Sequence, residues 1–391
     1  MTRATSGGVQ TRKGPAYPAA RKVAETVVGH FTRRAEAARA AGRDGLAPTP
    51  DAAAVEAVIN AAFWASLRRE EGHPPKISLA YLPPEQAEPP LMFARTLPLD
   101  PYALAKLAPA VERPGIHLGV WRCDGENLCV WGTTRAIPRL CFVLEVVEPG
   151  LLVVKYRRGS DPGKFANVVV LRGDEVKVVD GGGASLPDCP GMVTSLLGFG
   201  AASAPGDQVD VLVQLAVSMR AHGRGGTLLV VPAGSDAWRE SVIWPAPYAL
   251  EPAFPELKEM LARGEAERDD PEWQEALRRA VDAVAGMTAV DGAAVVNDRS
   301  ELLAFGAKIV QSRSGSEVER VVVTEPVAGS EPAVVDPAEL GGTRHLSAAQ
   351  FVQDQRNALA LVASQDGRFT VFAWSPCEGM VHAHRVETLL L

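Results

Sequence analysis

The sequence lacks the features of membrane and secreted proteins. No stretch approaches the roughly 18 uninterrupted apolar residues that a transmembrane helix needs. The opening residues, MTRATSGGVQTRKG, are polar and contain no apolar core of the signal-peptide type. Cysteine is scarce as well, with five residues in 391 and no C-x-x-C pair, which favours a reducing compartment over a disulfide scaffold. We therefore expect a cytoplasmic protein with no membrane partner.

An excess of positive charge is also missing. Acidic residues outnumber basic ones by 47 to 40, and the formal net charge is −7. Non-specific binding of duplex nucleic acid needs a basic surface, so that class of partner is not expected. A small anion site with a few well-placed cations stays compatible with this charge. The apolar content of 47% is ordinary for a globular protein, and no repeat of fixed period is present.

The length and a change of pattern predict two domains, because 391 residues are too many for one compact core. Residues 1–15 are expected to form a disordered tail, and residues 16–203 an α+β domain. That domain begins with a helix over 18–41 and a second helix capped by Thr49. Short β-branched runs between residues 115 and 180 are typical of an antiparallel meander.

Residues 204–391 alternate helices with buried strands, which predicts an α/β domain with a mixed sheet. Asp270 and Pro271 open a helix with an apolar face that continues through Val284. The runs GTLLVV, DGAAVV and ELLAFGAKIV are predicted strands. The polar segment 311–340 is predicted to be a loop.

The stretch GGTRHLSAAQF, residues 341–351, is the first candidate site. Ser347 and Gln350 have the spacing of a capping box, which predicts a helix from residue 348 and places Arg344 and His345 just before it. A helix N-terminus favours an anion, and a guanidinium suits phosphate oxygens. His345 could bind a metal or a phosphate. A capped helix with a surface Arg344 and a buried His345 explains the same pattern, and the spacing alone favours that plainer interpretation.

Three further patterns are weaker. Asp291 and Gly292 precede a strand, where the carboxylate could hold a divalent cation, but a strand-initiating turn is the preferred interpretation. Asp366-Gly367 predicts a hairpin turn that could direct Ser364 at a phosphate. His382 and His384 in VHAHRV have metal-like spacing, but a partly exposed strand is the preferred interpretation. Cys123 and Cys129 flank a turn and are expected to pack on paired strands.

Together and in this order, three of these motifs resemble those of the diadenylate cyclase family, whose members make cyclic di-AMP. That family carries D-G-A at a strand start, G-T-R-H-R before a helix, and a V-S-E-E-T-G-like hairpin. The matching stretches here are Asp291-Gly292-Ala293, Gly342-Thr343-Arg344-His345 and Ala363-Ser364-Gln365-Asp366-Gly367. The resemblance covers roughly residues 205–376. The N-terminal half resembles, by architecture, sensor-type modules fused to divergent cyclases of this family.

The resemblance implies a C-terminal diadenylate-cyclase-like domain that works as a face-to-face dimer. Each domain would hold one ATP and a divalent metal, Mg²⁺ or Mn²⁺, and would act by positioning and charge neutralisation. Asp291 and His345 would bind the metal and, with Arg344, form the catalytic set. The implied nucleotide contacts come from Gly292, Ala293, Gly342, Thr343, Arg344 and Ser364.

Two departures from the family pattern keep alternatives open. Leu346 stands where the family has the second Arg of R-H-R, and Gln365 replaces a Glu. The first hypothesis is a metal-dependent cyclase that condenses two ATP into cyclic di-AMP with release of pyrophosphate, regulated by an N-terminal sensor domain. The second is a catalytically impaired module that binds or senses a nucleotide or a cyclic dinucleotide. The third is a domain that only mediates assembly.

Overall fold

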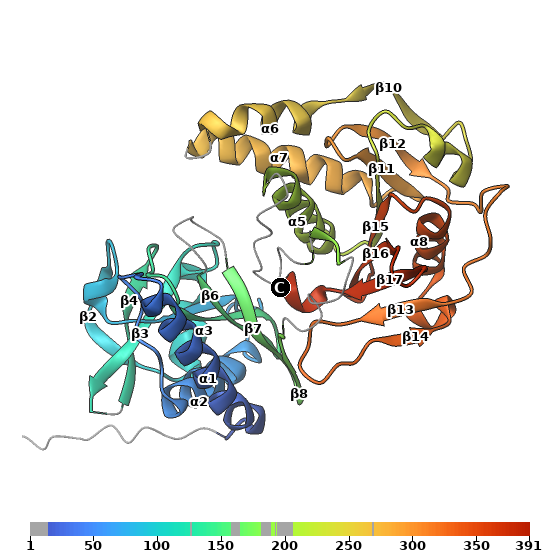
Figure 1. Ribbon diagram of the computed structural model, residues 1–391. Helices are drawn as coiled ribbons and strands as arrows, with labels where there is room; N and C mark the ends of the chain where they lie inside the picture. Colours follow the sequence, from blue (N-terminus) through green and yellow to red (C-terminus); the bar gives the residue numbers. More distant parts are fainter. Residues whose placement is uncertain are drawn as a thin grey trace, which may run out of the picture. The chain divides into compact units, whose positions relative to one another are not determined.

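The computed structural model describes residues 15–125, 127–157, 165–180, 189–191, 193, 206–267 and 270–391. Contacts divide the chain into two compact units, Met1–Val178 and Val179–Leu391 (Figure 1). The tail predicted over residues 1–15 lies almost entirely outside the described residues. So does the domain boundary predicted at residue 203, which stays a prediction. No helix in the described ranges is long and apolar enough to cross a membrane.

Three helices of the first unit contribute to its main core. They are α1 (Pro18–Ala40), α2 (Ala52–Ser66) and α3 (Pro101–Leu107). α1 agrees with the prediction, but the cap predicted for α2 is wrong. Asp51, not Thr49, is the N-cap, and its carboxylate accepts a hydrogen bond of 2.8 Å from the Ala54 N–H. Apolar helix side chains pack on one face of a sheet, together with alternate strand residues such as Leu79 and Leu144.

The sheet of the first unit has the strand order β2-β4-β3-β1-β5-β6-β7-β8. The strands are β1 (Ile77–Tyr81), β2 (Leu91–Pro98), β3 (His117–Asp124), β4 (Asn127–Thr134), β5 (Phe142–Glu148), β6 (Leu151–Arg157), β7 (Phe165–Arg172) and β8 (Glu175–Val178). The predicted runs from β3 onward all form strands, and β5 to β8 are an antiparallel meander. The meander is interrupted, however, because β1 lies between β3 and β5 and pairs in parallel with β3.

Cys123 and Cys129 lie on the paired strands β3 and β4, as expected. They form a disulfide bond, with Cα atoms 5.9 Å apart. The odd number of cysteines and the missing C-x-x-C pattern had favoured a reducing compartment over a disulfide scaffold, and they did not predict this bond. The bond joins neighbouring strands already held by a backbone ladder. Its closed loop is short, so it removes little conformational entropy from the unfolded chain.

The second unit is built on a mixed sheet with the order β10-β12-β11-β9-β15-β16-β17-β13-β14. The strands are β9 (Gly226–Val231), β10 (Tyr248–Phe254), β11 (Ala293–Asn297), β12 (Leu302–Ala307), β13 (Val321–Thr324), β14 (Ala333–Val335), β15 (Leu359–Ala363), β16 (Phe369–Ser375) and β17 (Met380–Arg385). β9 pairs in parallel with β11, and β13 with β17, while the other pairs are antiparallel. The predicted α/β class with a mixed sheet is confirmed.

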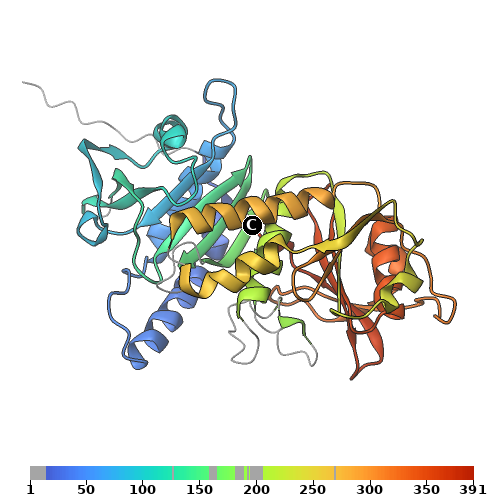
Figure 2. The same cartoon turned by 90° about the horizontal axis from the view of Figure 1, so that it is seen from above.

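Helices cover both faces of this sheet. One face packs against α5 (Gly206–Ala221), α6 (Glu256–Glu267) and α7 (Pro271–Met287), and the other against α8 (Thr343–Asp354). Strand β9 shows why both faces are covered. Leu228 lies in the core shared with α5, α6 and α7, Leu229 lies in the core shared with α8, and both side chains are fully buried. Figure 2 shows α6 and α7 lying side by side.

The segment 311–340 was predicted to be a loop, but part of it forms two strands. Its apolar residues 321–324 form β13, which pairs with β17, and β14 returns antiparallel beside β13. The four residues of β13 are too few to show a periodicity of their own. Their strand conformation follows from the backbone partners that β17 offers.

Candidate functional site

The three motifs meet at one edge of the second sheet. β9 and β11 begin at this edge and β15 ends there, with Ala293 paired to Thr227 and Ala363 paired to Gly226. β9 lies between the other two strands. The Asp291 and Ser364 backbones therefore lie on either side of it, two strand spacings or about 10 Å apart. Segments distant in the sequence are thus brought together.

Helix α8 begins at the same edge. The Arg344 guanidinium Nη1 lies 3.3 Å from the position that a Cβ on Gly225 would occupy, just before β9. The carbonyl oxygen of Ala363 and the side chain of Gln365 lie equally close to that position, at 3.2 and 3.3 Å. Arg344 therefore sits at the junction of β9, β15 and the hairpin that follows β15.

The start of α8 differs from the prediction. Gly342 is the N-cap, so Thr343, Arg344 and His345 form the first turn, and Ser347 lies inside the helix. The predicted capping box of Ser347 and Gln350 does not form, because the Gln350 side chain has other hydrogen-bond partners. Its Oε1 accepts from the Val318 N–H at 3.0 Å, and its Nε2 donates to the Ser316 carbonyl at 2.9 Å. The earlier start places Arg344 where the helix dipole is positive.

Arg344 is exposed, and no hydrogen bond or ion pair to another described residue holds its guanidinium. Arg368, nearby on the hairpin, is held by the Asp366 carboxylate, with Nε 3.3 Å from Oδ2. Arg385 ends β17, next to the start of β16, since it pairs with Thr370. The edge thus gathers several guanidinium groups around one engaged carboxylate. Arg344 is available to an anionic ligand.

His345 is buried, with 4% of its surface exposed, and its Nε2 has no hydrogen-bond partner in the described part of the chain. Burial lowers the pKa of His345 below its usual value, and the charge of Arg385 lowers it further, while Asp366 opposes this effect. The imidazole is therefore neutral at pH 7. The plainer interpretation of the sequence, a surface Arg344 and a buried His345, describes the side-chain positions correctly.

Asp291 has an open environment. Its side chain is 89% exposed, and Oδ2 lies 3.3 Å from the Lys308 Nζ. Gly292 has a φ of +109°, and a Cβ there would lie 2.5 Å from the carbonyl carbon of Gly306 in β12. Close strand packing therefore already requires a glycine at this position. Ala293 is buried in β11.

The hairpin after β15 holds its polar groups internally. A hydrogen bond from Ser364 lowers the pKa of Asp366 below its usual value. The Ser364 N–H donates to the Arg368 carbonyl at 2.9 Å, which closes the predicted turn. Gln365 donates from Nε2 to the Arg224 carbonyl at 3.3 Å. Ser364 would have to leave Asp366, or share its hydroxyl, to contact a phosphate.

A divalent metal fits this edge only with help from a substrate. Among the residues that the structure describes, no three His, Cys, Asp or Glu side chains are grouped as metal ligands. Asp291 supplies one accessible carboxylate, whereas the His345 Nε2, which has no hydrogen-bond partner among the described residues, is buried. Mg²⁺ is commonly bound by one or two carboxylates together with substrate phosphates and water. Asp291 has the chemistry of such a ligand.

His382 and His384 lie on β17 and are buried, not partly exposed as expected. The His384 Nδ1 is 2.7 Å from the Thr324 Oγ1, and the His382 Nε2 is 3.1 Å from the Glu378 Oε2. Each ring thus has a polar partner, although the Glu378 carboxylate is exposed and the His384 Nε2 has no partner among the described residues. Their spacing of two places both rings on one face of β17, which pairs with β13 and β16.

Acid should destabilise the second unit through His384. Burial lowers the pKa of His384 to about 3, with His382 as a smaller cause. The unfolded chain takes up the proton near pH 6.5, so the stabilisation is complete above that pH and is lost as the pH falls toward 3. Between pH 7 and pH 5 this one group should remove about 2 kcal/mol of unfolding free energy. Urea unfolding at both pH values should show a smaller difference in His384→Gln than in the unmodified protein or in His73→Gln. An unchanged difference in His384→Gln would contradict this assignment.

Residues 44–135 match the family model described as a probable sensor domain, DACNV. The matched segment runs from the residues before α2 to the end of β4, and it includes the Cys123–Cys129 bond. It covers less than half of the chain. A search of curated proteins found no match. The comparisons therefore support a sensor domain in the first unit, while the resemblance of the second unit rests on its own motifs.

Proposed function

We propose that the second unit is a metal-dependent dinucleotide cyclase that condenses two ATP molecules into cyclic di-AMP under control of the N-terminal sensor domain. The observation that carries this proposal is the convergence of the D-G-A, T-R-H and S-Q-D-G motifs on one sheet edge. Arg344 lies in the first turn of α8 and has no hydrogen-bond or ion-pair partner among the described residues, which supports a phosphate site there. The sensor-domain match supports the regulatory part.

In this proposal the residues of the edge bind and orient the triphosphate. The Arg344 guanidinium and the N–H groups of Thr343 and Arg344 hold phosphate oxygens, while the His345 N–H stays bonded to the Gly342 carbonyl. Asp291 holds Mg²⁺ or Mn²⁺, which when bound supplies charge neutralisation at the phosphates. The 3′-hydroxyl of each ATP attacks the α-phosphorus of the other. A new P–O bond forms as the hydroxyl loses its proton to solvent, the α–β anhydride bond breaks, and pyrophosphate leaves. Two units facing each other in a dimer would complete this arrangement.

Incubation of the purified full chain with ATP and Mn²⁺ or Mg²⁺ should yield cyclic di-AMP, identified by mass. Asp291→Asn should lower the rate at least about 100-fold, because a metal-binding carboxylate contributes several kcal/mol to transition-state stabilisation. Asp236→Asn is the matched control, since Asp236 is an exposed carboxylate outside this edge, 3.1 Å from Arg239. Undiminished product from Asp291→Asn would refute the proposed site.

A binding module without turnover is the second candidate. Leu346, which stands in place of the family's second Arg, follows the first turn of α8 and is 43% exposed, and it offers no charge to a phosphate. Gln365 is engaged with the Arg224 carbonyl and carries no carboxylate. Calorimetry that shows ATP or cyclic di-AMP binding, with no product at either metal, would favour this function over the cyclase. A clear product peak would exclude it.

A further inference from the structure

The disulfide bond of the first unit connects an irregular position of β3 to a regular position of β4. The ladder between these strands shifts register between Arg122 and Asp124, where β3 has one residue more than β4. Cys123 is that extra residue, a β-bulge that lies outside the regular pairing. The bond to Cys129 fixes this bulge on the neighbouring strand.

The two sulfur atoms of the bond differ in their access to solvent. Cys123 is exposed, whereas Cys129 is buried, with 8% of its surface exposed. Exchange between a thiol and a disulfide begins when a thiolate reaches one of the two sulfur atoms, and exposed disulfides are therefore the labile and regulatory ones. A thiolate from solvent can reach the bond at Cys123.

The surrounding fold holds the two residues together even without the bond. Val120 and Val130, which pair just before the bulge, are fully buried in the core beneath the helices. Once the bond is opened, both thiols therefore stay on paired strands, and the bond can form again. In the reducing compartment that the sequence favours, disulfides that do form are usually transient and serve catalysis or redox sensing.

The other described cysteines are less suited to this chemistry. Cys141 is fully buried, and burial raises the pKa of its thiol. Burial also raises the pKa of Cys189, to about 11. The thiolate is the reactive form of cysteine, so these two side chains are poor nucleophiles at pH 7. Cys377 is exposed, but it lies in the second unit.

A change at the bulge can reach helix α2 through Arg122, which directly precedes Cys123. The Arg122 guanidinium contacts Oδ2 of the Asp51 carboxylate. Oδ1 of the same carboxylate caps α2 by accepting from the Ala54 N–H at 2.8 Å. When the bulge relaxes, Arg122 moves with it, and the cap of α2 loses a contact that holds it in place.

We propose that Cys123 and Cys129 form a redox switch in the first unit, in which a small-molecule thiol opens the bond, frees the bulge of β3 and loosens the cap of α2. The switch goes beyond the proposed cyclase function, because it requires neither a nucleotide nor a metal. It lies inside the segment that matches the sensor-domain model, and it gives that domain a signal of defined chemistry.

The chemistry of the switch is a balanced exchange. A thiolate attacks the Cys123 Sγ, the S–S bond breaks, and its electron pair leaves on the Cys129 Sγ, which takes a proton from solvent. A second thiolate attacks the sulfur that the first thiol contributed, and the Cys123 thiolate leaves and is protonated. The protein disulfide gains two electrons, and the two small thiols become one small-molecule disulfide.

Equilibration of the full chain in glutathione buffers tests this exchange, with acid quenching, alkylation by N-ethylmaleimide and peptide mapping by mass. Cys123 and Cys129 should be alkylated together in millimolar reduced glutathione and should both be protected in oxidised glutathione. Cys377→Ser is the matched control, since it removes an exposed thiol from the second unit. This variant should leave the transition of the pair unchanged.

Hydrogen exchange tests the conformational part of the proposal. The N–H groups of β3 and β4 next to the bond should exchange about 10-fold faster in the reduced protein, because a cross-link that restrained local opening is gone. The Ala54 N–H at the cap of α2 should also exchange faster. Cys123→Ser should show the faster exchange in both buffers. Since Cys123 is exposed and serine is of similar size, this variant should fold, which its circular dichroism spectrum checks.

Three results would overturn the proposal. The first is a pair that stays oxidised in millimolar reduced glutathione, which would make the bond purely structural. The second is a pair that stays as two thiols in oxidised glutathione. The third is equal exchange of the hairpin or of the Ala54 N–H in both states. None of these measurements involves ATP, so failure of the cyclase proposal leaves the test valid.

Discussion

Gly292→Ala is expected to destabilise the second unit by about 3 kcal/mol, whether or not a nucleotide is present. The backbone of Gly292 has a φ of +109°, which an L side chain rarely adopts. An added Cβ would also lie 2.5 Å from the carbonyl carbon and 2.7 Å from the carbonyl oxygen of Gly306. Both atoms belong to the backbone of β12, which cannot move without disturbing its pairing with β10 and β11.

Gly286→Ala is the matched control for this prediction. Gly286 lies in α7, and an added Cβ there would meet no atom within 4 Å. Alanine favours a helix over glycine by about 1 kcal/mol, so this variant should be as stable as the original protein or more so. Urea unfolding of both variants measures the difference. If Gly292→Ala keeps its stability and loses only ATP binding, the glycine serves the nucleotide and not the strand contact.

Arg344→Ala is expected to weaken ATP binding about 10- to 100-fold while leaving folding intact. A hydrogen bond to a charged group contributes about 1.5–3 kcal/mol, and each 1.4 kcal/mol is a factor of ten in affinity. The guanidinium has no partner to lose among the described residues, so its removal should not change the unfolding free energy. Arg344→Lys should restore only part of the affinity, because an ammonium cannot bind two phosphate oxygens as a planar fork does.

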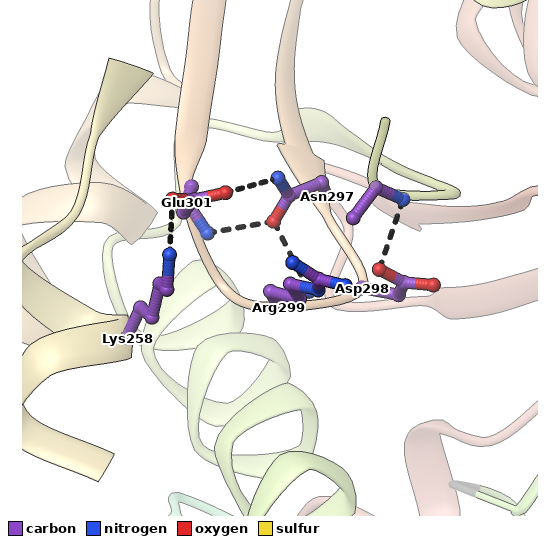
Figure 3. A network of polar contacts seen from close by, with 6 residues as sticks. Lys258, Asn297, Asp298, Arg299 and Glu301 are labelled. Carbon is purple, nitrogen blue, oxygen red and sulfur yellow. Dashed lines mark hydrogen bonds and ion pairs between the residues drawn. The ribbon is translucent and has the colours of Figure 1, made fainter. Parts of the chain in front are cut away.

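Arg299→Ala is the control for this second prediction. Arg299 is exposed on the β11–β12 turn, at the far edge of the same sheet (Figure 3), and the variant keeps its backbone hydrogen bond to Asn297. Calorimetry with ATP and Mg²⁺ should give the same affinity for Arg299→Ala as for the unmodified protein. Equal ATP affinities for Arg344→Ala and Arg299→Ala would show that Arg344 does not contact the nucleotide.

Local patterns predicted the long elements well. α7 begins at Pro271 after the Asp270 cap, whose carboxylate accepts from the Glu272 N–H at 2.9 Å, and its apolar face contains Leu277 and Val281 as expected. Each of these signals lies within one or two turns of the helix. A strong cap and a regular apolar period leave little for distant contacts to change.

Local sequence patterns did not predict the short strands, and they predicted a helix cap that does not form. β1 and β14 have five and three residues, and their conformation depends on the strands that accept their hydrogen bonds. The pair Ser347 and Gln350 had the correct spacing for a cap, but the Val318 N–H and the Ser316 carbonyl bind Gln350 from a distant segment. Those partners are invisible in the sequence around α8.

The amino-acid sequence by itself determined the fold class of the second unit, the order of its three motifs and the exposed or buried character of Arg344 and His345. These follow from periodicity, turn chemistry and residue polarity, which act over a few residues. Only the tertiary structure decided that Asp291 and Ser364 flank the same strand and that Gly292 is required by β12. Strand order and register bring such residues together, and both depend on pairing between segments that are distant along the chain.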